Sequence, residues 1–216
     1  MSSIFVDFEM NSVSKAFKEV RNNCKREIIE IGAVKLDEKG EEEDSFICYV
    51  KPQYGHITSY YENLTGISDE MVSDAPGFQE AVSKFLDWLG DDYEIYSWSE
   101  SDEDQLRREA AFKGNMDPRF GEMFEHWIDY QKEFGKLLGI DKQISLKDAV
   151  HAIDREFTGQ QHDALWDARN TAYIYRLSLN PKAFNKTMKP LIDLFRPKTM
   201  STNLGELFGS EFSKLM

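Results

Sequence analysis

The sequence predicts a mixed α/β fold in which an antiparallel hairpin starts a sheet and β/α units extend it. Two observations support this prediction. Strand-like segments come first, at residues 3–10, 26–37 and 44–52, and the turn DEKG at 37–40 joins the second segment to the third. After residue 60, helical and strand-like segments alternate.

The later elements follow from apolar spacing and from helix-start signals. Behind the breaker pair Pro76 and Gly77, apolar side chains have the spacing of a helix over 78–89. Ser145 is a candidate N-cap of another helix, with Asp148 at its third position. The remaining expected elements are strands at 94–98 and 126–131, a helix over 104–113, and a last strong helix from Asp163 to about Leu179.

Length and composition indicate a folded domain with an appendage. The chain has 216 residues, 41% of them hydrophobic and 13% aromatic, so it can bury a full core. The periodic pattern fills residues 1–180, whereas residues 181–216 contain scattered prolines and basic side chains. We expect the second segment to be a C-terminal extension that packs on the domain or contacts a partner, with a partly ordered tail as the alternative.

Charge, cysteine usage and hydropathy argue against several classes of protein. The net charge of −13 opposes broad electrostatic attraction to nucleic acid or anionic membrane, but it permits local binding through cations and a small basic rim. Cys24 and Cys48 have no CxxC or Cys/His spacing, so we expect free thiols. No apolar run is long enough to span a bilayer, and the opening MSSIFVDFEM does not resemble a signal peptide. We therefore expect a cytoplasmic protein with no membrane partner.

The first strand-like segment contains two carboxylates, in FVDFEM. Side chains alternate along a strand, so Asp7 and Glu9 face one side while Val6 and Phe8 face the other. Two neighbouring, partly buried carboxylates are tolerated mainly when a proton or a cation lies between them. An edge strand with an acidic solvent face explains this segment equally well by itself.

A third candidate acid, Asp102, lies where the strand at 94–98 gives way to a helix. Ligands of α/β folds usually bind beyond the carboxyl end of a strand, at this kind of position. Glu100 and Asp104 are close enough in sequence to compete with Asp102 for the role. Alternatively, Ser101 or Asp102 simply caps the helix.

The segment QHDALWDARNTA, residues 161–172, supplies a histidine and a fourth acid. If Asp163 caps the helix, Asp167 lies just over one turn inside it and His162 lies in the preceding loop. His162 and Asp167 can converge only in that arrangement, and a loop histidine beside a fixed carboxylate suits a general base. Taken singly, a solvated Asp167 and a structural His162 are the simpler interpretations.

In their order and spacing, these motifs resemble the DEDD exonuclease superfamily in its histidine variant. Two further segments are similar to family members: EIIEIGAVKLD at 27–37 and ENLTGISDEMV at 62–72. Both are closest to the exoribonuclease branch. The resemblance covers roughly residues 1–180 and implies a ribonuclease-H-like fold, with the first three strands antiparallel, and a 3′–5′ exonuclease domain that releases nucleoside 5′-monophosphates.

The resemblance also implies roles for individual residues. Two divalent cations, Mg²⁺ or Mn²⁺, would be held by Asp7, Glu9, Asp102 and Asp167, with His162 as the general base. Oxygen ligands suit such hard cations better than zinc. The residues that the resemblance places near the terminal nucleotide are Phe8, Met10, Leu64 and Thr65, and apolar contacts there would suit binding with little sequence preference.

The expected partner is a single-stranded nucleic-acid 3′ end, with RNA favoured over DNA. A DNA-trimming enzyme is one alternative, and a catalytically weak nuclease fold that acts as a nucleic-acid or protein-binding module is another. The insert at 11–26 carries Lys15, Lys18, Arg21, Lys25 and Arg26, opposed only by Glu19. It is either a basic rim for a phosphate backbone or a solvated loop.

Overall fold

The computed structural model describes residues 2–114, 117–153 and 158–195. Its strands are β1 (Ser2–Ser12), β2 (Arg26–Leu36), β3 (Glu42–Tyr49), β4 (Tyr93–Ser97) and β5 (Trp127–Asp129). Its helices are α1 (Lys18–Asn23), α2 (Ser59–Thr65), α3 (Asp69–Val72), α4 (Phe78–Leu89), α5 (Glu100–Phe112), α6 (Arg119–Glu125), α7 (Tyr130–Leu138), α8 (Leu146–Ala152), α9 (Ala164–Ser178) and α10 (Pro181–Phe195).

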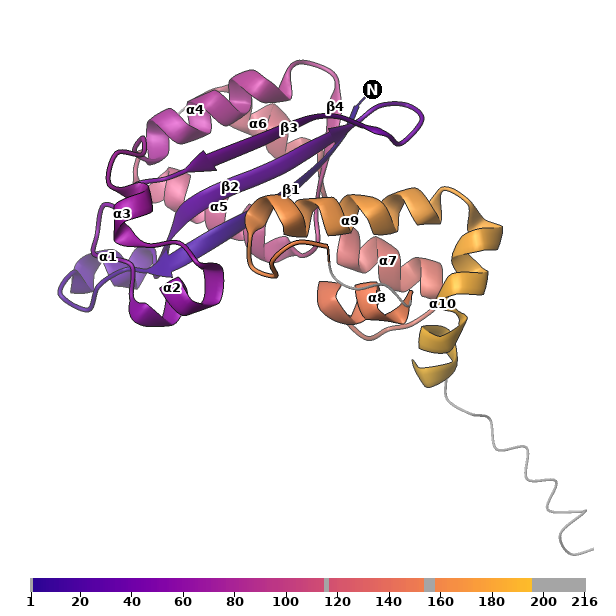
Figure 1. The fold of residues 1–216 in the computed structure, drawn as a ribbon. Helices are drawn as coiled ribbons and strands as arrows, with labels where there is room; N and C mark the ends of the chain where they lie inside the picture. Colours follow the sequence, from indigo (N-terminus) through magenta and orange to yellow (C-terminus); the bar gives the residue numbers. More distant parts are fainter. Residues whose placement is uncertain (1, 115–116, 154–157, 196–216) are drawn as a thin grey trace, which may run out of the picture.

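The strands form one mixed sheet in the order β3-β2-β1-β4-β5 (Figure 1). β1 is antiparallel to β2, and β2 is antiparallel to β3. β4 is parallel to β1, and β5 is parallel to β4. The antiparallel start and the later β/α units are therefore as the sequence predicts, and β1 is the central strand.

Helices cover both faces of the sheet, as the alternation of side chains along β1 requires. Ile4, Val6 and Phe8 face one core, which they share with α4, α5 and α6. Phe5 faces a second core, which it shares with α7, α8, α9 and α10. Asp7 and Glu9 follow Phe5 at two-residue steps, so they point toward the α9 side of the sheet.

Local signals explain the helix boundaries. α4 spans 78–89 as predicted, and its apolar stripe is buried. The side chain of Ser145 accepts a hydrogen bond from the main-chain nitrogen of Asp148, and that of Asp163 accepts one from Trp166. Both are the N-cap interactions that the sequence predicts.

Several boundaries differ from the sequence predictions; the predicted strand at 44–52, for example, ends at Tyr49. The predicted strand at 126–131 is wrong at its end, because Asp129 caps α7 by accepting from the nitrogen of Lys132. The predicted helix at 104–113 begins at Glu100 instead, because Ser99 caps it. The helices α1, α2, α3, α6, α7 and α10 are absent from the sequence predictions. The first four are too short to display a full apolar period.

Part of the C-terminal segment is well packed. α10 lies beside α8 and α9 (Figure 1). It buries Phe184, Met188, Leu191 and Ile192 in the second core. The predicted division of the chain at residue 180 stays a prediction, and residues 196–216 lie outside the described residues. Within the described residues, no helix has both the length and the apolar character that a membrane span needs.

Candidate active site

The acid pair lies on the central strand. Asp7 pairs with Gly32 across the β1–β2 ladder, and Glu9 pairs with Glu30. The register shifts immediately after Glu9, where Met10 pairs with Ile28. Such an irregularity bends the strand locally. Glu9 is buried and Asp7 half-buried, so both carboxylates are largely removed from bulk water.

Asp102 joins this pair from the first turn of α5. Its Oδ1 accepts a hydrogen bond from the main-chain N–H of Phe8, at 3.2 Å. Phe8 lies between Asp7 and Glu9, so this bond fixes α5 against the acidic part of β1. Asp102 is 5% exposed. The two alternative acids of this segment are engaged in other contacts. Glu100 forms an ion pair with Lys132, and Asp104 forms one with Arg108.

The loop before α9 brings His162 and Asp167 together, as predicted. Asp167 Oδ2 accepts a hydrogen bond from the main-chain N–H of His162, at 3.3 Å. His162 has a φ of 66°, the single left-handed conformation of a non-glycine residue among the described residues. This conformation costs energy for a histidine, and the surrounding contacts must maintain it.

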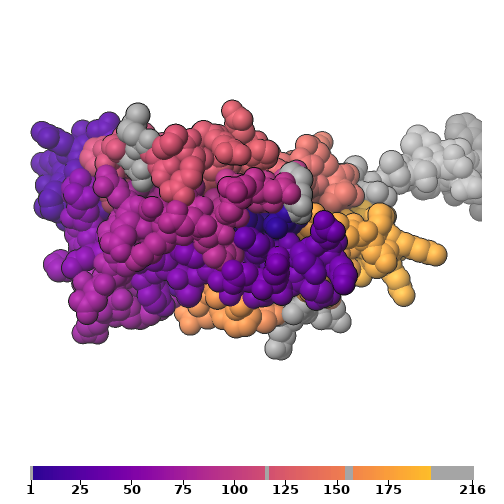
Figure 2. Space-filling model, turned by 90° about the horizontal axis from the view of Figure 1, so that it is seen from above, coloured from indigo at the N-terminus to yellow at the C-terminus, as the bar shows by residue number. Residues whose placement is uncertain are grey.

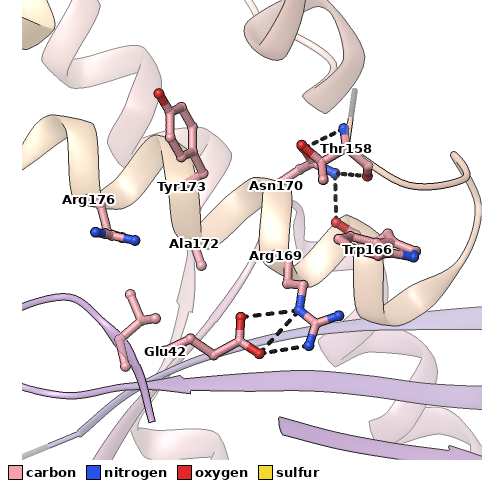
Figure 3. Close-up of a pocket in the computed structure, with 9 residues that line it drawn as sticks. Glu42, Thr158, Trp166, Arg169, Asn170, Ala172, Tyr173 and Arg176 are labelled. Atoms are coloured by element: carbon pink, nitrogen blue, oxygen red, sulfur yellow. Dashed lines mark hydrogen bonds and ion pairs between the residues drawn. The ribbon is translucent and has the colours of Figure 1, made fainter. Parts of the chain in front are cut away.

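Asn170 and Trp166 of α9 anchor that loop (Figure 3). Asn170 accepts from the nitrogen of Thr158, and its amide donates to the carbonyls of Thr158 and Trp166. Gly159 lies so close to the Trp166 ring that an added Cβ would be 2.1 Å from a ring atom. These contacts fix the approach to His162.

The N-terminus of α9 rests directly on β2, and the sequence analysis missed the two residues that make this possible. Gly32 has no side chain, and an added Cβ would lie 2.2 Å from the nitrogen of Leu165. Glu30 is buried and accepts a hydrogen bond from Ala164 N–H, at 3.0 Å. The sequence contained a signal for these two residues. Glu30 and Gly32 are two positions apart in EIIEIGAVKLD, so they lie on one face of the strand, the same face as Asp7 and Glu9.

The crowded carboxylates perturb one another. Burial, reinforced by the charges of Asp102 and Asp167, raises the pKa of Asp7 well above its usual value. Burial and the charge of Asp167 raise the pKa of Glu9 to about 9. Burial raises the pKa of Asp102 to about 7 and that of Asp167 to about 7. Such a set is stabilised in its ionised form only by added positive charge.

The nearby bases and acids complete the electrostatic environment. Burial raises the pKa of Glu30 to about 7, although the Ala164 N–H opposes the shift. Burial lowers the pKa of the His162 imidazole below 6.5, and the charge of Lys147 acts in the same direction. His162 is therefore neutral, and able to accept a proton, at neutral pH.

All five predicted catalytic residues line one open pocket of about 440 Å³. Its further lining residues, which the sequence analysis did not assign to the site, are Tyr61, Trp98, Ser99, Ser101, Ser145, Leu146, Lys147 and Gln161. Arg26, considered above as part of a basic rim, also lines it. Exposed Lys147 and Arg26 place positive charge at the rim of an acidic pocket.

Three of the four predicted substrate contacts line the pocket: Phe8, Met10 and Leu64. The Phe8 ring also packs on Trp127, with ring centroids 6.2 Å apart. Thr65 is not among the lining residues, because its hydroxyl donates to the carbonyl of Tyr61 and accepts from Ile67 N–H. Its contact with a nucleotide stays a prediction, as do the other three.

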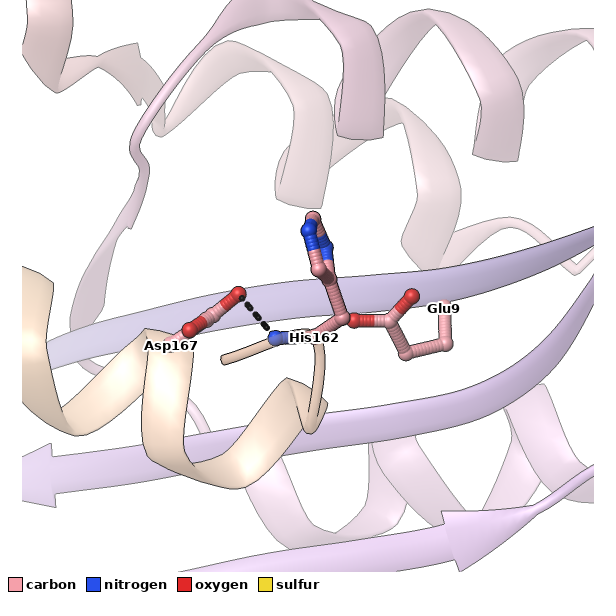
Figure 4. Close-up of side chains that lie close together, drawn as sticks. All are labelled: Glu9, His162 and Asp167. Atoms are coloured by element: carbon pink, nitrogen blue, oxygen red, sulfur yellow. Dashed lines mark hydrogen bonds between the residues drawn. The ribbon is translucent and has the colours of Figure 1, made fainter. Parts of the chain in front are cut away.

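The donor set fits divalent cations. Glu9, His162 and Asp167 each offer a ligand atom within 4.8 Å of the others (Figure 4). Asp167 Oδ1 is buried and has no hydrogen-bond partner among the described residues. A carboxylate oxygen in that state is costly unless an ion satisfies it. In Figure 4 the main-chain nitrogen of His162 makes the bond to Asp167, which leaves the imidazole available.

Comparisons with known proteins match this geometry. The family model RNase_T, described as "Exonuclease", matches residues 4–175. ERI1 exoribonuclease 2 of Danio rerio is 29% identical over 94% of this chain and 40% of its own length. DNA polymerase III PolC-type of Bacillus subtilis is 30% identical over 68% of this chain and 10% of its own length.

A solved structure is similar over most of both chains. It is the nuclease domain of 3′hExo, a DEDDh family member, bound to rAMP. The TM-score is 0.72 at 25% identity, covering 85% of this chain and 94% of that one. The likeness confirms the predicted ribonuclease-H-like fold. The chain spans less than half the length of the ERI1 exoribonuclease 2 relative above.

Proposed function

The chain belongs to the exonuclease family whose model it matches over residues 4–175, and we propose that it is a 3′–5′ exoribonuclease. It would hydrolyse phosphodiester bonds at single-stranded 3′ ends and release nucleoside 5′-monophosphates. One observation carries the proposal: Asp7, Glu9, Asp102, Asp167 and His162 all line the same pocket. A binding module without catalysis would not require four buried or half-buried acids and a base in one cavity.

The family implies divalent cations, and we propose two, either Mg²⁺ or Mn²⁺, held by Asp7, Glu9, Asp102 and Asp167. The buried, unpartnered Asp167 Oδ1 supports this assignment, as do carboxylate oxygens of Glu9 and Asp167 that lie within 4.8 Å of each other. Asp7 and Asp102 line the same pocket. When bound, such ions activate water and stabilise the charge that develops on oxygen during in-line displacement at phosphorus.

The protein's own residues have separate tasks in this proposal. His162 accepts the proton of the attacking water, because its lowered pKa keeps the imidazole neutral. The hydrogen bond from Phe8 N–H holds Asp102, and that from His162 N–H holds Asp167. Leu64 and Met10 offer apolar surface to the terminal nucleotide. Lys147 offers positive charge to a phosphate.

RNA is the proposed substrate because the exoribonuclease relative matches 94% of this chain, against 68% for the DNA polymerase. The match to the DNA polymerase favours the DNA-trimming alternative. A cytoplasmic location remains a prediction.

The test uses purified protein and 5′-labelled RNA and DNA oligonucleotides of identical sequence, with Mg²⁺ or Mn²⁺. We expect stepwise shortening of RNA from its 3′ end, and no shortening after chelation or with Asp7→Ala. Faster shortening of DNA would favour the alternative substrate. Tight binding with no change in length in either metal would support the module interpretation.

A further inference from the structure

A second hollow lies beside the candidate active site, between the end of β1, α1 and the segment that leads into α2. Its volume is about 980 Å³, and we call it the basic groove. Its lining residues are Ser12, Val13, Ser14, Lys15, Phe17, Arg21, Gln53, Gly55, His56, Ile57, Thr58 and Ser59. Neither the family roles above nor the proposed mechanism uses it.

Residues that line the basic groove and residues that line the catalytic pocket are neighbours on two elements. Ser12 lines the groove, and its partner across the β1–β2 ladder, Arg26, lines the pocket. Likewise, Ser59 at the start of α2 lines the groove, and Leu64 near its end lines the pocket. The pocket and the groove therefore lie next to each other, as a strand that extends from one to the other would require.

A buried asparagine fixes the junction between β1 and the groove. Asn11 is 1% exposed, and its amide donates to the carbonyl of His56, at 3.1 Å. Its Oδ1 accepts from Thr58 N–H, at 3.2 Å. The groove wall at residues 56–58 is thereby tied to the strand that carries Asp7 and Glu9, so the two sites hold a fixed relation.

The charge of this region contrasts with the rest of an acidic protein. Most of the described lysines and arginines in helices α4 to α10 are paired with carboxylates, such as Lys84 with Glu80 and Arg169 with Glu42. Within the described residues, by contrast, none of the five cations of segment 11–26 has a carboxylate within ion-pair distance; they are Lys15, Lys18, Arg21, Lys25 and Arg26. The segment forms one end of the molecule, opposite α10, in Figures 1 and 2.

Aromatic rings accompany these cations. Phe17 is 42% exposed although it lines the groove, and its ring is held edge-on by Tyr54 at 5.5 Å between centroids. Tyr60 is 68% exposed and stands beside Tyr61 of the catalytic pocket. Positive charge that follows a backbone, with exposed rings for stacking, is the usual design of a single-strand path.

We propose that the basic groove binds the sugar–phosphate backbone of the substrate strand upstream of its 3′ end, with Lys15 and Arg21 contacting phosphates and Phe17 stacking on a base. The proposal rests on the exonuclease function and assigns a further substrate-binding region to it. Unpaired cations here let a protein of net charge −13 hold a polyanion locally.

Length-dependent kinetics test this proposal. The variant Lys15→Gln/Arg21→Gln is compared with Lys182→Gln/Lys186→Gln, which removes the same charge from exposed positions on α10. The substrates are the dinucleotide UpU, which reaches only the catalytic pocket, and an oligouridylate of about 20 nucleotides. Binding of the longer strand is measured in parallel by fluorescence anisotropy at several salt concentrations, in wild type and in both variants.

For the groove variant, we expect unchanged turnover of UpU and a KM for the longer strand raised about five- to tenfold at low salt, because two phosphate contacts are lost. The slope of log affinity against log salt concentration should become shallower by about 1.4, at about 0.7 per phosphate of a single strand. The α10 variant should behave as wild type.

An equal loss on both substrates, an equal loss in the α10 variant, or unchanged binding of the longer strand would each overturn the proposal. Arg21 also donates a hydrogen bond to the carbonyl of Val13, so the single variant Lys15→Glu serves if the double variant fails to fold. The anisotropy measurement distinguishes a failure of this proposal from a failure of the proposed function. If the protein cleaves nothing, binding of the longer strand through the groove can still be detected. If the wild-type protein does not bind the longer strand, the groove does not have this role.

Discussion

An added Cβ on Gly32 would lie 2.2 Å from the main-chain nitrogen of Leu165, so the first turn of α9 sits directly on the strand that pairs with Asp7. This close approach brings Asp167 and His162 to β1. A residue without a side chain is therefore a condition of the site, although it takes no part in the chemistry.

Gly32→Ala should accordingly lower both stability and activity. The added methyl group would clash with main-chain atoms of α9, and the clash can be relieved only by moving the whole helix. We expect this shift to lower the free energy of unfolding by about 1–3 kcal/mol. Urea denaturation measures that cost. Gly121→Ala in α6 is the matched control, since an added Cβ there contacts nothing within 4 Å. Wild-type stability and cleavage in Gly32→Ala would contradict this account of α9.

Asp102→Asn should greatly reduce cleavage, whereas the corresponding amide substitutions of its acidic neighbours should be tolerated. We expect a loss of at least about 100-fold in kcat/KM, since a lost cation ligand removes several kcal/mol of transition-state stabilisation. Asp104→Asn and Glu100→Gln should stay within about twofold, because these side chains form exposed ion pairs of little energetic value. Steady-state cleavage of one RNA substrate ranks the three variants. A larger loss in Asp104→Asn than in Asp102→Asn would reassign the ligand.

His162→Ala should slow cleavage by about 10²–10⁴-fold, the usual contribution of a general base. Divalent-cation binding, followed by calorimetry, should remain largely intact. The imidazole must be neutral to accept a proton, and its pKa is lowered from 6.5, so wild-type kcat/KM should rise with pH with a midpoint below 6.5. Parallel loss of cation binding and cleavage would make His162 a ligand or a structural residue.

The free energy of unfolding in chelator should fall as pH rises from about 5 to 8. Asp102 and Asp167 have usual pKa values of 3.8 and folded values of about 7, and Glu9 has a folded value of about 9. Between these limits the folded protein binds more protons than the unfolded chain, so raising the pH favours unfolding. We expect bound divalent cations to replace those protons.

Thermal melts at both pH values, with and without Mg²⁺, measure this linkage. We expect Mg²⁺ to raise the Tm more at pH 8 than at pH 5, by about 2–4 °C for each kcal/mol restored. An Asp7→Ala/Asp167→Ala variant, which lacks two of the proposed ligands, is the control and should lose most of the difference. A Tm in chelator that rises over this pH range would show that the acids do not repel one another in the folded protein.

Lys113→Met should strongly destabilise the fold without touching the site. Lys113 Nζ lies 2.8 Å from Glu27 and 2.8 Å from Glu109, and all three side chains are almost fully buried. Removing the cation leaves two buried acids without a counter-charge, which costs about 3–5 kcal/mol. The exposed Lys84→Met, which breaks a surface pair with Glu80, should cost less than about 1 kcal/mol. Equal urea midpoints for the two variants would refute the distinction.

The sequence by itself determined the features that depend on neighbouring residues. Alternation along β1 makes Asp7 and Glu9 co-facial, the spacing over 78–89 forms α4, and the caps Ser145 and Asp163 start their helices where predicted. The position of His162 outside α9 follows from the cap at Asp163. These are short-range effects of backbone geometry and hydrogen bonding, so a local pattern is sufficient to predict them.

Only the tertiary structure decided which of the clustered acids in α5 faces the site, because Phe8, 94 residues earlier in sequence, binds Asp102 and no other. It also revealed that α9 packs on Glu30 and Gly32, and that the basic groove lies next to the pocket. Burial and charge coupling at these places arise between residues far apart in the chain. Their energies depend on packing distance and on exclusion of water, which a sequence pattern does not specify.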